Sequence, residues 1–315
     1  MTTVAAVRAV AIHEYGGPEL LEVTDVPEPP LGPDVVMVEA RAAGVNPVDY
    51  KIRQGGLVSR YPCHFPLVPG WDVAGVVRAV GPAVPEFAPG DEVVGYVRRD
   101  HIQWGTYAEL VPAPVRTLAA KPPSLSWAQA AALPLAGLTA WQALTRALEV
   151  GHGDVVLVHA AAGGVGSFAV QLAQTLGAGV IGTASEANHD HLRALGAEPV
   201  AYGEGLVERV RSVAPEGVTA VLDLVGGEAL DASPQLLREG GRLASVVDPG
   251  RVQKLGGRYW FVRPDAGDLA VLCGLVDEGR LAVHVERTFP LEQAADAHRL
   301  LEGGHMRGKA ALEIA

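Results

Sequence analysis

Segment 155–167 constrains the fold of this chain more than any other part of the sequence. It begins with four apolar residues, Val155–Val158, and runs through small residues into an amphipathic stretch. A buried strand, a tight loop and a helix in this order form a dinucleotide-binding unit, because glycines let the backbone approach a pyrophosphate and the helix N-terminus offers it free N–H groups. A βα turn that binds nothing is the alternative, and Ala161 holds the first glycine position of the usual pattern. The residues predicted to bind the pyrophosphate are Gly163, Gly164, Val165 and Gly166.

Apolar β-runs alternate with helical stretches from residue 155 to residue 247. This alternation predicts βαβ units around a parallel sheet that is buried on both faces. The fold class is therefore α/β, with a doubly wound parallel sheet in this part of the chain. The expected strands are 155–159, 180–183, 220–224 and 242–247, and the expected helices are 167–176 and 189–195.

The first 120 residues have a different pattern, in which short strands are separated by Gly and Pro turns. Such spacing indicates a β-rich, partly barrel-like domain. The pattern changes near residues 121–123, after which Ser124 or Ser126 can cap a helix. We expect the tail of the chain to return to the β-rich domain. The expected strands are 35–38, 72–80, 92–96 and 309–314, and the expected helices are 127–132, 266–278 and 291–302.

The end of the second strand of the predicted parallel sheet indicates which dinucleotide binds. NAD sites usually carry an acidic residue there to hold the ribose hydroxyls. This chain has Ser185 at that position, and a hydroxyl can donate to a 2′-phosphate instead. Tyr202 is a further donor candidate, whereas Glu186 counts against a phosphate nearby. We therefore predict NADPH as the cofactor, with Ser185 and Tyr202 among its contacts.

Charge and cysteine content exclude several classes of protein. The 315 residues include 25 Lys and Arg against 36 Asp and Glu, a net charge of −11, which argues against nucleic-acid or anionic membrane partners. Two cysteines cannot form a disulfide framework, and no secretory segment opens the chain, so we expect a cytoplasmic protein. Two charge-free stretches, 122–145 and 155–185, are interrupted by Pro, Gly or Gln, and we expect no membrane span.

In its motifs the chain resembles the zinc-independent quinone oxidoreductase and enone reductase branch of the medium-chain dehydrogenase/reductase family. The resemblance covers essentially the whole chain. It implies a GroES-like catalytic domain formed by residues 1–123 and 264–315, with a Rossmann domain, residues 124–263, inserted in it. It also implies an active site in the cleft and a homodimer or homotetramer. The segments that carry it are 42–51, 69–75, 133–140, 160–166, 223–227 and 307–309.

The same resemblance predicts that no metal is bound. Zinc-dependent members of the family have Cys where this chain has Asn46, and Gly-His-Glu where it has Gly70-Trp71-Asp72. The structural zinc lobe needs four closely spaced cysteines, and this chain has only Cys63 and Cys273. Without a Lewis acid to polarise an alkoxide, simple alcohol dehydrogenation becomes the poorer hypothesis.

The chemistry that remains is hydride transfer from a nicotinamide to a quinone or an α,β-unsaturated carbonyl compound. Negative charge then appears on a distant oxygen, where hydrogen-bond donors can stabilise it without a metal. We predict Asn46, Tyr50 and Lys51 as the catalytic donors. The alternative is that Asn46-Pro47 forms a turn and that Asp49 caps the following helix.

Further cofactor contacts are implied by the resemblance alone. Thr139 is expected near the nicotinamide. Three of the other residues stand at the ends of expected strands, and two stand at the start of the strand expected at 309–314. The implied contacts are Thr139, Gly226, Val246, Val247, Arg307 and Lys309.

Two alternatives to the predicted function stay open: a metal-free ketone or aldehyde reductase, and a protein that binds NADPH without turnover.

Overall fold

The computed structural model describes residues 6–304 and 306–314. The chain forms two compact units. The first, here called the β-rich unit, comprises residues 1–135, 264–278 and 283–315. The second, the parallel-sheet unit, comprises residues 136–263 and 279–282. Every helix among the described residues is too short or too polar to span a lipid bilayer.

The β-rich unit is organised around a seven-stranded sheet, which two strand pairs, β1-β2 and β4-β7, accompany. The sheet has the order β16-β17-β3-β5-β6-β9, and β8 pairs with β3 as well. Its central strand β3 pairs with β5 along one edge and with β8 and β17 in turn along the other. The strands are β1 Ala6–Ala11, β2 Glu22–Pro27, β3 Val35–Val45, β4 Cys63–Val68, β5 Asp72–Val80, β6 Glu92–Tyr96, β7 Ile102–Trp104, β8 Leu110–Pro114, β9 Leu118–Ala120, β16 Val285–Pro290 and β17 Lys309–Glu313.

Two helices of this unit begin at residues whose side chains accept from an N–H group of the first turn. The hydroxyl of Ser126 accepts from the Gln129 N–H at 3.3 Å, and the carboxylate of Asp265 accepts from the Asp268 N–H at 3.1 Å. Both are N-cap arrangements. The helices are α1 Pro47–Arg53, α2 Trp127–Ala132, α9 Ala266–Asp277 and α10 Ala294–Glu302, with short 3₁₀ turns at Pro18–Leu20, Val115–Thr117 and Leu291–Gln293.

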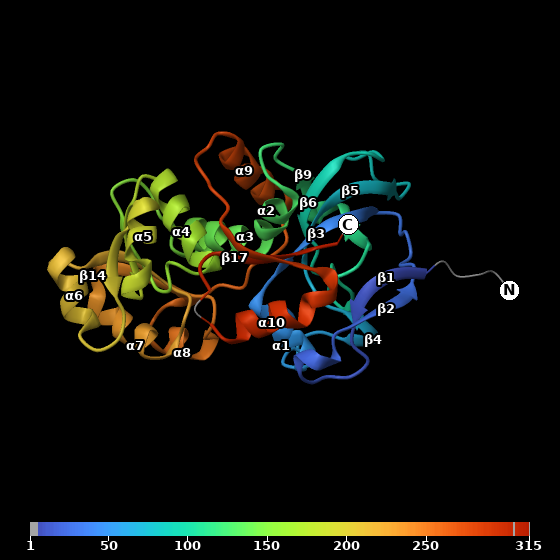
Figure 1. Ribbon diagram of the computed structural model, residues 1–315. Helices are drawn as coiled ribbons and strands as arrows, with labels where there is room; N and C mark the ends of the chain where they lie inside the picture. Colours follow the sequence, from blue (N-terminus) through green and yellow to red (C-terminus); the bar gives the residue numbers. More distant parts are fainter. Residues whose placement is uncertain (1–5, 305, 315) are drawn as a thin grey trace. The chain divides into compact units, whose positions relative to one another are not determined.

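The tail of the chain returns to the β-rich unit, as the sequence predicts. Strand β17 runs antiparallel to β3, with Ala310 opposite Val45 and Glu313 opposite Ala42. On its other edge β17 pairs in parallel with β16. In Figure 1 this strand, coloured red, extends toward the blue and cyan strands of the unit. Lys309 therefore stands beside the end of β3, where α1 begins.

Residues 124–135 pack with the β-rich unit, which differs from the boundary at residue 124 that we expected. Helix α2 lies on β3, β5 and β17. Its residues Ala130, Ala131 and Ala132 are fully buried. A Cβ atom at Gly44 of β3 would lie 2.2 Å from the Ala131 carbonyl oxygen, so the helix backbone rests directly on the strand. Small residues on both elements make this close approach possible.

The parallel-sheet unit contains a six-stranded sheet in which every neighbouring pair is parallel. The strand order is β12-β11-β10-β13-β14-β15. In chain order within the unit this is 3-2-1-4-5-6, the order of the doubly wound dinucleotide-binding fold. The predicted fold class is therefore confirmed. The strands are β10 Val155–Val158, β11 Gly179–Ala184, β12 Glu198–Ala201, β13 Val218–Asp223, β14 Leu237–Ser245 and β15 Arg258–Tyr259.

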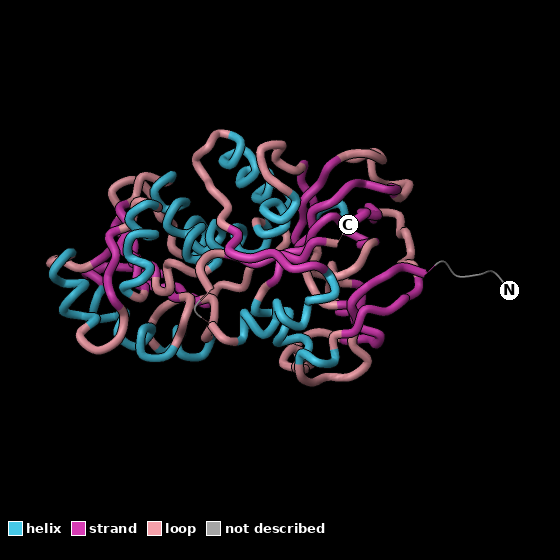
Figure 2. Tube along the Cα trace, in the orientation of Figure 1, coloured by secondary structure: helices cyan, strands magenta, loops and turns pink. Residues whose placement is uncertain are grey.

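Helices lie on both sides of this sheet. In Figure 1, α4 and α5 lie on one side of the strands and α7 and α8 on the other, and Figure 2 shows the strands in magenta and the helices in cyan. Since the chain reverses its winding between β10 and β13, the carboxyl ends of these two strands mark the switch point at which such sheets bind ligands. The helices are α3 Pro134–Gln142, α4 Gly164–Thr175, α5 His189–Ala194, α6 Leu206–Val213, α7 Gly227–Leu236 and α8 Pro249–Lys254, with a π-helical turn at Ala143–Ala147 and a 3₁₀ turn at Glu186–Asn188.

Candidate active site

The glycine loop joins β10 to α4 at the switch point of the parallel sheet. A Cβ atom at Gly166 would lie 2.3 Å from the Ala160 carbonyl oxygen and 2.6 Å from the Ala161 Cα atom, so the helix packs on the loop more closely than any side chain allows. A Cβ atom at Gly163 would meet nothing closer than 3.4 Å. Gly163 is the N-cap of the twelve-residue helix α4, whose first N–H groups have no partner within the helix. Free N–H groups at the start of a helix and open space beside Gly163 are what a pyrophosphate would need at this loop.

Ser185 and Tyr202 follow the two strands on one side of β10. Ser185 comes directly after β11, and its hydroxyl accepts from the Asn188 side-chain amide at 3.2 Å. Tyr202 comes directly after β12 and is 55% exposed. The structure therefore places both predicted contacts at the same edge of the sheet as the glycine loop, and it leaves the Ser185 side chain only partly buried.

Gly226, Val246 and Val247 follow the two strands on the other side of β10. Gly226 has a φ of +78° and donates its N–H to the Asp223 carboxylate at 2.9 Å. The other oxygen of Asp223 accepts from the Ser245 hydroxyl at 2.6 Å. This carboxylate therefore holds the turns after β13 and β14 together.

A buried histidine behind the glycine loop was missed by the sequence analysis. His159 directly follows β10, and its side chain lies 3.3 Å from the Thr183 hydroxyl through Nδ1 and 3.2 Å from the Ser233 hydroxyl through Nε2. Because Ser233 donates its own hydrogen to the Ala229 carbonyl, Nε2 carries the imidazole proton. Burial lowers the pKa of His159 to about 4, although the nearby Asp223 acts in the opposite direction.

The neutral His159 ring positions the start of the glycine loop. The Thr183 hydroxyl, which faces Nδ1, also accepts from the Ala160 N–H at 3.1 Å. Ala160 has a φ of +53°, an uncommon value for a residue other than glycine. A polar residue that ends an apolar strand was the sequence signal for this role.

Thr139, a predicted cofactor contact, lies on α3 and is 5% exposed.

A second group of buried polar residues surrounds Asn46 in the β-rich unit. Asn46 lies between β3 and α1, and its Nδ2 atom donates to an Asp72 carboxylate oxygen at 2.9 Å. Its Oδ1 atom accepts from the Lys309 ammonium, which also donates to the Val45 carbonyl at 3.1 Å. The second oxygen of Asp72 accepts from the Leu135 N–H at 3.0 Å. We call Asn46, Asp72 and Lys309 the Asn46 group; their exposures are 1%, 0% and 3%.

Asp49 caps α1, as the alternative interpretation of this segment predicts. Its carboxylate accepts from the Asn46 backbone N–H at 2.8 Å and from the Tyr107 hydroxyl at 3.1 Å. The Tyr107 hydroxyl lies 3.3 Å from Nε2 of His298. Asp72 and Lys309 engage the two ends of the Asn46 side-chain amide.

Burial dominates the ionisation of these residues. It raises the pKa of Asp72 to about 7, against the opposing effects of Lys309 and Asn46. It also raises the pKa of Asp49 to about 7, although the Asn46 N–H favours the carboxylate. Burial lowers the pKa of Lys309, and the nearby Asp72 and Asp49 oppose this shift without reversing it. Two carboxyl groups and one ammonium therefore share a buried region.

The other predicted catalytic residues have different surroundings. Tyr50 is partly buried, and its pKa is raised first by burial and then by Glu302 of α10. Lys51 is exposed. Arg307 precedes β17, and its backbone N–H donates to Glu286 of β16. Among the described residues the structure thus brings Asn46 together with Lys309, a predicted cofactor contact, and no hydrogen bond joins Tyr50 or Lys51 to them.

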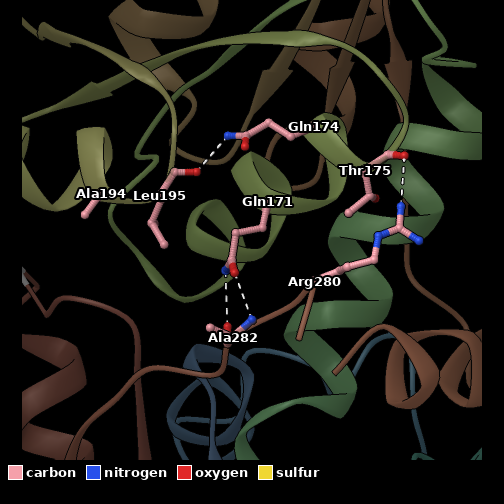
Figure 3. A pocket seen from close by; sticks show the side chains of 7 residues that line it. All are labelled: Gln171, Gln174, Thr175, Ala194, Leu195, Arg280 and Ala282. Atoms are coloured by element: carbon pink, nitrogen blue, oxygen red, sulfur yellow. Dashed lines mark hydrogen bonds between the residues drawn. The ribbon is translucent and has the colours of Figure 1, made fainter. Parts of the chain in front are cut away.

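One pocket of about 460 Å³ lies in the parallel-sheet unit away from the predicted site residues. Figure 3 shows its polar side chains bonded to neighbouring backbone. Gln171 bonds both the N–H and the carbonyl of Ala282, and Gln174 donates to the Leu195 carbonyl at 2.7 Å. These contacts fasten residues 280–282 and the end of α5 to α4, and they give the pocket a structural role.

The strand order, the glycine loop and the β-rich sheet define a dinucleotide-binding oxidoreductase of the kind that pairs a Rossmann domain with a GroES-like domain. Comparison with known families agrees. The alcohol dehydrogenase GroES-like domain family matches residues 32–123, and the zinc-binding dehydrogenase family matches residues 195–312. The chain belongs to the medium-chain dehydrogenase/reductase family.

Individual relatives include both long and similar-sized proteins. The chain is 38% identical to the spectinabilin polyketide synthase protein NorB of Streptomyces orinoci over 90% of its length, but spans only 13% of that protein. It is 36% identical to the chloroplastic NADPH-dependent alkenal/one oxidoreductase of Arabidopsis thaliana, over 96% of this chain and 78% of that one.

Two solved structures resemble the whole chain. The quinone oxidoreductase from Coxiella burnetii is 38% identical, with a TM-score of 0.88, over 99% of this chain and all of that one. An NAD-dependent alcohol dehydrogenase is 37% identical, with the same TM-score, over 98% of this chain and all of that one.

The residues present do not fit a zinc ion, although one matching family is described as zinc-binding. Asn46 offers an amide whose oxygen already faces the Lys309 ammonium, a cation that a metal would repel. Trp71 is buried against Tyr61 and Tyr96 and offers no ligand atom. Within residues 6–304 and 306–314, no group of three or more His, Cys, Asp or Glu side chains could hold a metal.

Proposed function

We propose that this chain is an NADPH-dependent oxidoreductase that transfers hydride to a quinone or an α,β-unsaturated carbonyl compound without zinc. The observation that carries the proposal is the Asn46 group. An amide donor backed by an ammonium stands at the position of a zinc-ligand cysteine in the zinc-dependent members. Conjugated acceptors need hydrogen-bond donors at their oxygen, whereas alcohols need a group that polarises an alkoxide.

The cofactor half of the proposal is supported by the glycine loop and by Ser185. When bound, NADPH would supply a hydride from C4 of its nicotinamide. Gly163, Gly164, Val165 and Gly166 would receive the pyrophosphate at the start of α4. Ser185 would donate to the 2′-phosphate, where an acidic residue would repel it. The name of the Arabidopsis relative, an NADPH-dependent enzyme, favours the same cofactor.

In the proposed reaction Asn46 stabilises the negative charge that develops on the substrate oxygen. Nδ2 has two hydrogens, and Asp72 accepts one of them. The other is the donor that we assign to the substrate oxygen. Since Asn46 is only 1% exposed, we propose that this contact runs through an ordered water. Tyr50 and Lys51 stay as predicted donors farther along α1.

We also propose that the protein acts in the cytoplasm as a homodimer or homotetramer, with small-molecule partners. A net charge of −11 supports the absence of nucleic-acid and anionic membrane partners. Thr139, Tyr202, Gly226, Val246, Val247 and Arg307 are proposed as further cofactor contacts.

A second candidate function is reduction of a ketone or aldehyde. The likeness to an alcohol dehydrogenase structure favours it. The two functions differ in the atom that receives the hydride: the β-carbon of a conjugated enone, or its carbonyl carbon.

The test is a product analysis with labelled cofactor. Purified protein is mixed with NADPH deuterated at C4 and a panel of quinones and enones. We expect oxidation of NADPH, and deuterium at the β-carbon of a saturated ketone. Deuterium at the carbonyl carbon of an allylic alcohol supports the second candidate instead. Binding of NADPH without turnover on any acceptor contradicts both.

Zinc independence has its own test. We expect treatment with a chelator to leave the rate and the melting temperature unchanged. Stoichiometric zinc by elemental analysis, with loss of activity when it is removed, contradicts the proposal.

A further inference from the structure

The Asn46 amide is held at both ends by charged groups from two different strands. Lys309 of β17 donates to Oδ1, and Asp72 of β5 accepts from Nδ2. Rotation of the amide by 180° would turn its N–H groups toward the ammonium and its oxygen toward the carboxylate. Both hydrogen bonds would be lost, and hydrogen bonds to charged groups are stronger than neutral ones. Only one orientation of the amide is therefore compatible with its neighbours.

Each of the two charged groups is itself fixed. Lys309 donates a second hydrogen bond to the Val45 carbonyl at 3.1 Å, and Asp72 accepts from the Leu135 N–H at 3.0 Å. Both side chains are almost fully buried, so water does not compete for these contacts. The amide is thus positioned by the pairing of β17 with β3 and of β5 with β3.

We propose that Lys309 and Asp72 are positioning residues that lock the Asn46 amide so that its second Nδ2 hydrogen is its donor toward the substrate. The ammonium at Oδ1 withdraws electron density from the amide and strengthens the remaining N–H as a donor, as in other hydrogen-bond chains. The inference rests on the proposed function, because it assigns that donor to the substrate oxygen. It extends the proposed function by giving Lys309 a role other than contact with the cofactor.

The fixed orientation of the Asn46 amide determines the class of substrate. A substrate oxygen that accepts, such as a carbonyl, quinone or enolate oxygen, finds an N–H. A hydroxyl that must donate finds an amide oxygen already engaged by a cation. The group therefore favours conjugated carbonyl acceptors over alcohols.

The sequence allows a direct spectroscopic test of whether the Asn46 amide is held in one orientation. The chain contains only two asparagines, Asn46 and Asn188. Protein labelled with ¹⁵N-asparagine therefore gives two side-chain NH₂ signals, and Asn188, which bonds Ser185, serves as an internal reference. We expect Lys309→Met to shift the Asn46 signals and to speed their exchange with water, and to leave those of Asn188 unchanged. Unchanged Asn46 signals in Lys309→Met overturn the proposal, whether or not the protein reduces enones.

Kinetics separate positioning from cofactor contact. We expect Lys309→Met to lower kcat for an enone by roughly 10- to 100-fold, as misplacement of a catalytic group does, and to leave the Kd of NADPH unchanged. A higher Kd with unchanged kcat would show a cofactor contact and overturn the proposal. Glu313→Gln is the matched control, since Glu313 is an exposed charge on the same strand and should affect neither value.

A double variant separates positioning from charge balance. Above pH 7, where Asp72 is ionised, Lys309→Met alone leaves its carboxylate buried without a cation, which destabilises the fold. In Asp72→Asn/Lys309→Met neither charge is present, so we expect the melting temperature to recover while kcat stays low. If kcat also returns to within about threefold of wild type, a change of about 0.7 kcal/mol, Lys309 only balances charge and the proposal is wrong. A wild-type protein that reduces no quinone or enone contradicts the proposed function, and the NMR result then still decides whether the amide is locked.

Discussion

Lys309, the first residue of β17, donates a hydrogen bond to the side-chain oxygen of Asn46, which lies 263 positions earlier in the sequence. From the sequence, Lys309 is expected to contact the cofactor and Asn46 to take part in catalysis. The structure joins them with Asp72 in one buried group. Their shared environment is the basis of the predictions on catalysis and on pH.

Replacement of Asn46 by alanine tests its role as a donor. We expect Asn46→Ala to lower kcat by about 10²–10³, the range for loss of one donor to a developing oxyanion. The Kd of NADPH should not change, because the glycine loop belongs to the other unit. Steady-state kinetics and fluorescence titration measure the two quantities. Gln54→Ala, which removes an exposed amide at the other end of α1, is the control. A kcat near that of wild type would mean that Asn46 serves only the fold.

Replacement of Ser185 tests the cofactor preference. A carboxylate at this position repels the 2′-phosphate, and like charges in contact cost several kcal/mol. We expect Ser185→Asp to weaken NADPH binding by about tenfold or more and to leave NADH binding equal or stronger. Ser212→Asp adds the same charge at an exposed serine on α6 and should change neither affinity. Tighter binding of NADH than NADPH by the wild type contradicts the assignment.

Two glycines of the loop should respond differently to alanine. At Gly166 a Cβ atom would lie 2.3 Å from the Ala160 carbonyl oxygen, so Gly166→Ala should lower the melting temperature as well as NADPH affinity. At Gly163 the nearest atom is 3.4 Å away and φ is −75°, so Gly163→Ala should fold normally. If the pyrophosphate approaches this residue, the methyl group still weakens NADPH binding. Equal affinity in Gly163→Ala and wild type would show that the loop does not bind there.

The buried carboxyl of Asp72 makes stability depend on pH. Burial raises the pKa of Asp72 to about 7 in the folded chain, from 3.8. Between about pH 4 and pH 7 the folded state therefore holds a proton that the unfolded state has lost. This contribution favours folding most below pH 4 and declines as the pH rises to 7.

Asp72→Asn removes this dependence. The free energy of unfolding of the variant minus that of wild type should therefore increase from pH 4 to pH 7. Burial lowers the pKa of His159 to about 4 and that of His298 to about 3. A lowered histidine pKa makes the folded state more stable as the pH rises, which is opposite to the effect of Asp72. Both histidines are present in each protein, so their contributions cancel in the difference. Urea titrations at several pH values measure it, with the exposed Asp190→Asn as control. A difference independent of pH contradicts the raised pKa.

Features that depend on neighbouring residues could be predicted from the sequence. The strand, loop and helix at 155–175 have an apolar run, glycines and an amphipathic period within one short segment, and the structure has β10 and α4 there. The strands 72–80 and 92–96 and the helix 127–132 match β5, β6 and α2 in their bounds. In each case turn or capping residues mark the ends.

Features that depend on distant residues could not be predicted. The sequence near Lys309 shows a charge at the start of a strand, and only the pairing of β17 with β3 reveals that it meets Asn46. Tyr107 reaches Asp49, and His298 reaches the Tyr107 hydroxyl, from separate segments with no local motif. The six residues of α2 carry no signal for the strands on which the helix packs, so its packing on β3 was not foreseen. Strand register and packing partners are set by tertiary contacts.

The position of β17 has a consequence for the order in which the chain folds during synthesis. This strand is internal to the β-rich sheet, between β16 and β3, yet it is synthesised after the other strands of that sheet. The parallel sheet is built from residues 155–259, all of which are synthesised before β17. Until residues 309–313 emerge, β3 has an open edge, and Asn46 and Asp72 have no ammonium partner. The β-rich sheet is therefore completed by the last of its strands to be synthesised, and exposure of that edge to other nascent chains is the hazard that its folding has to avoid.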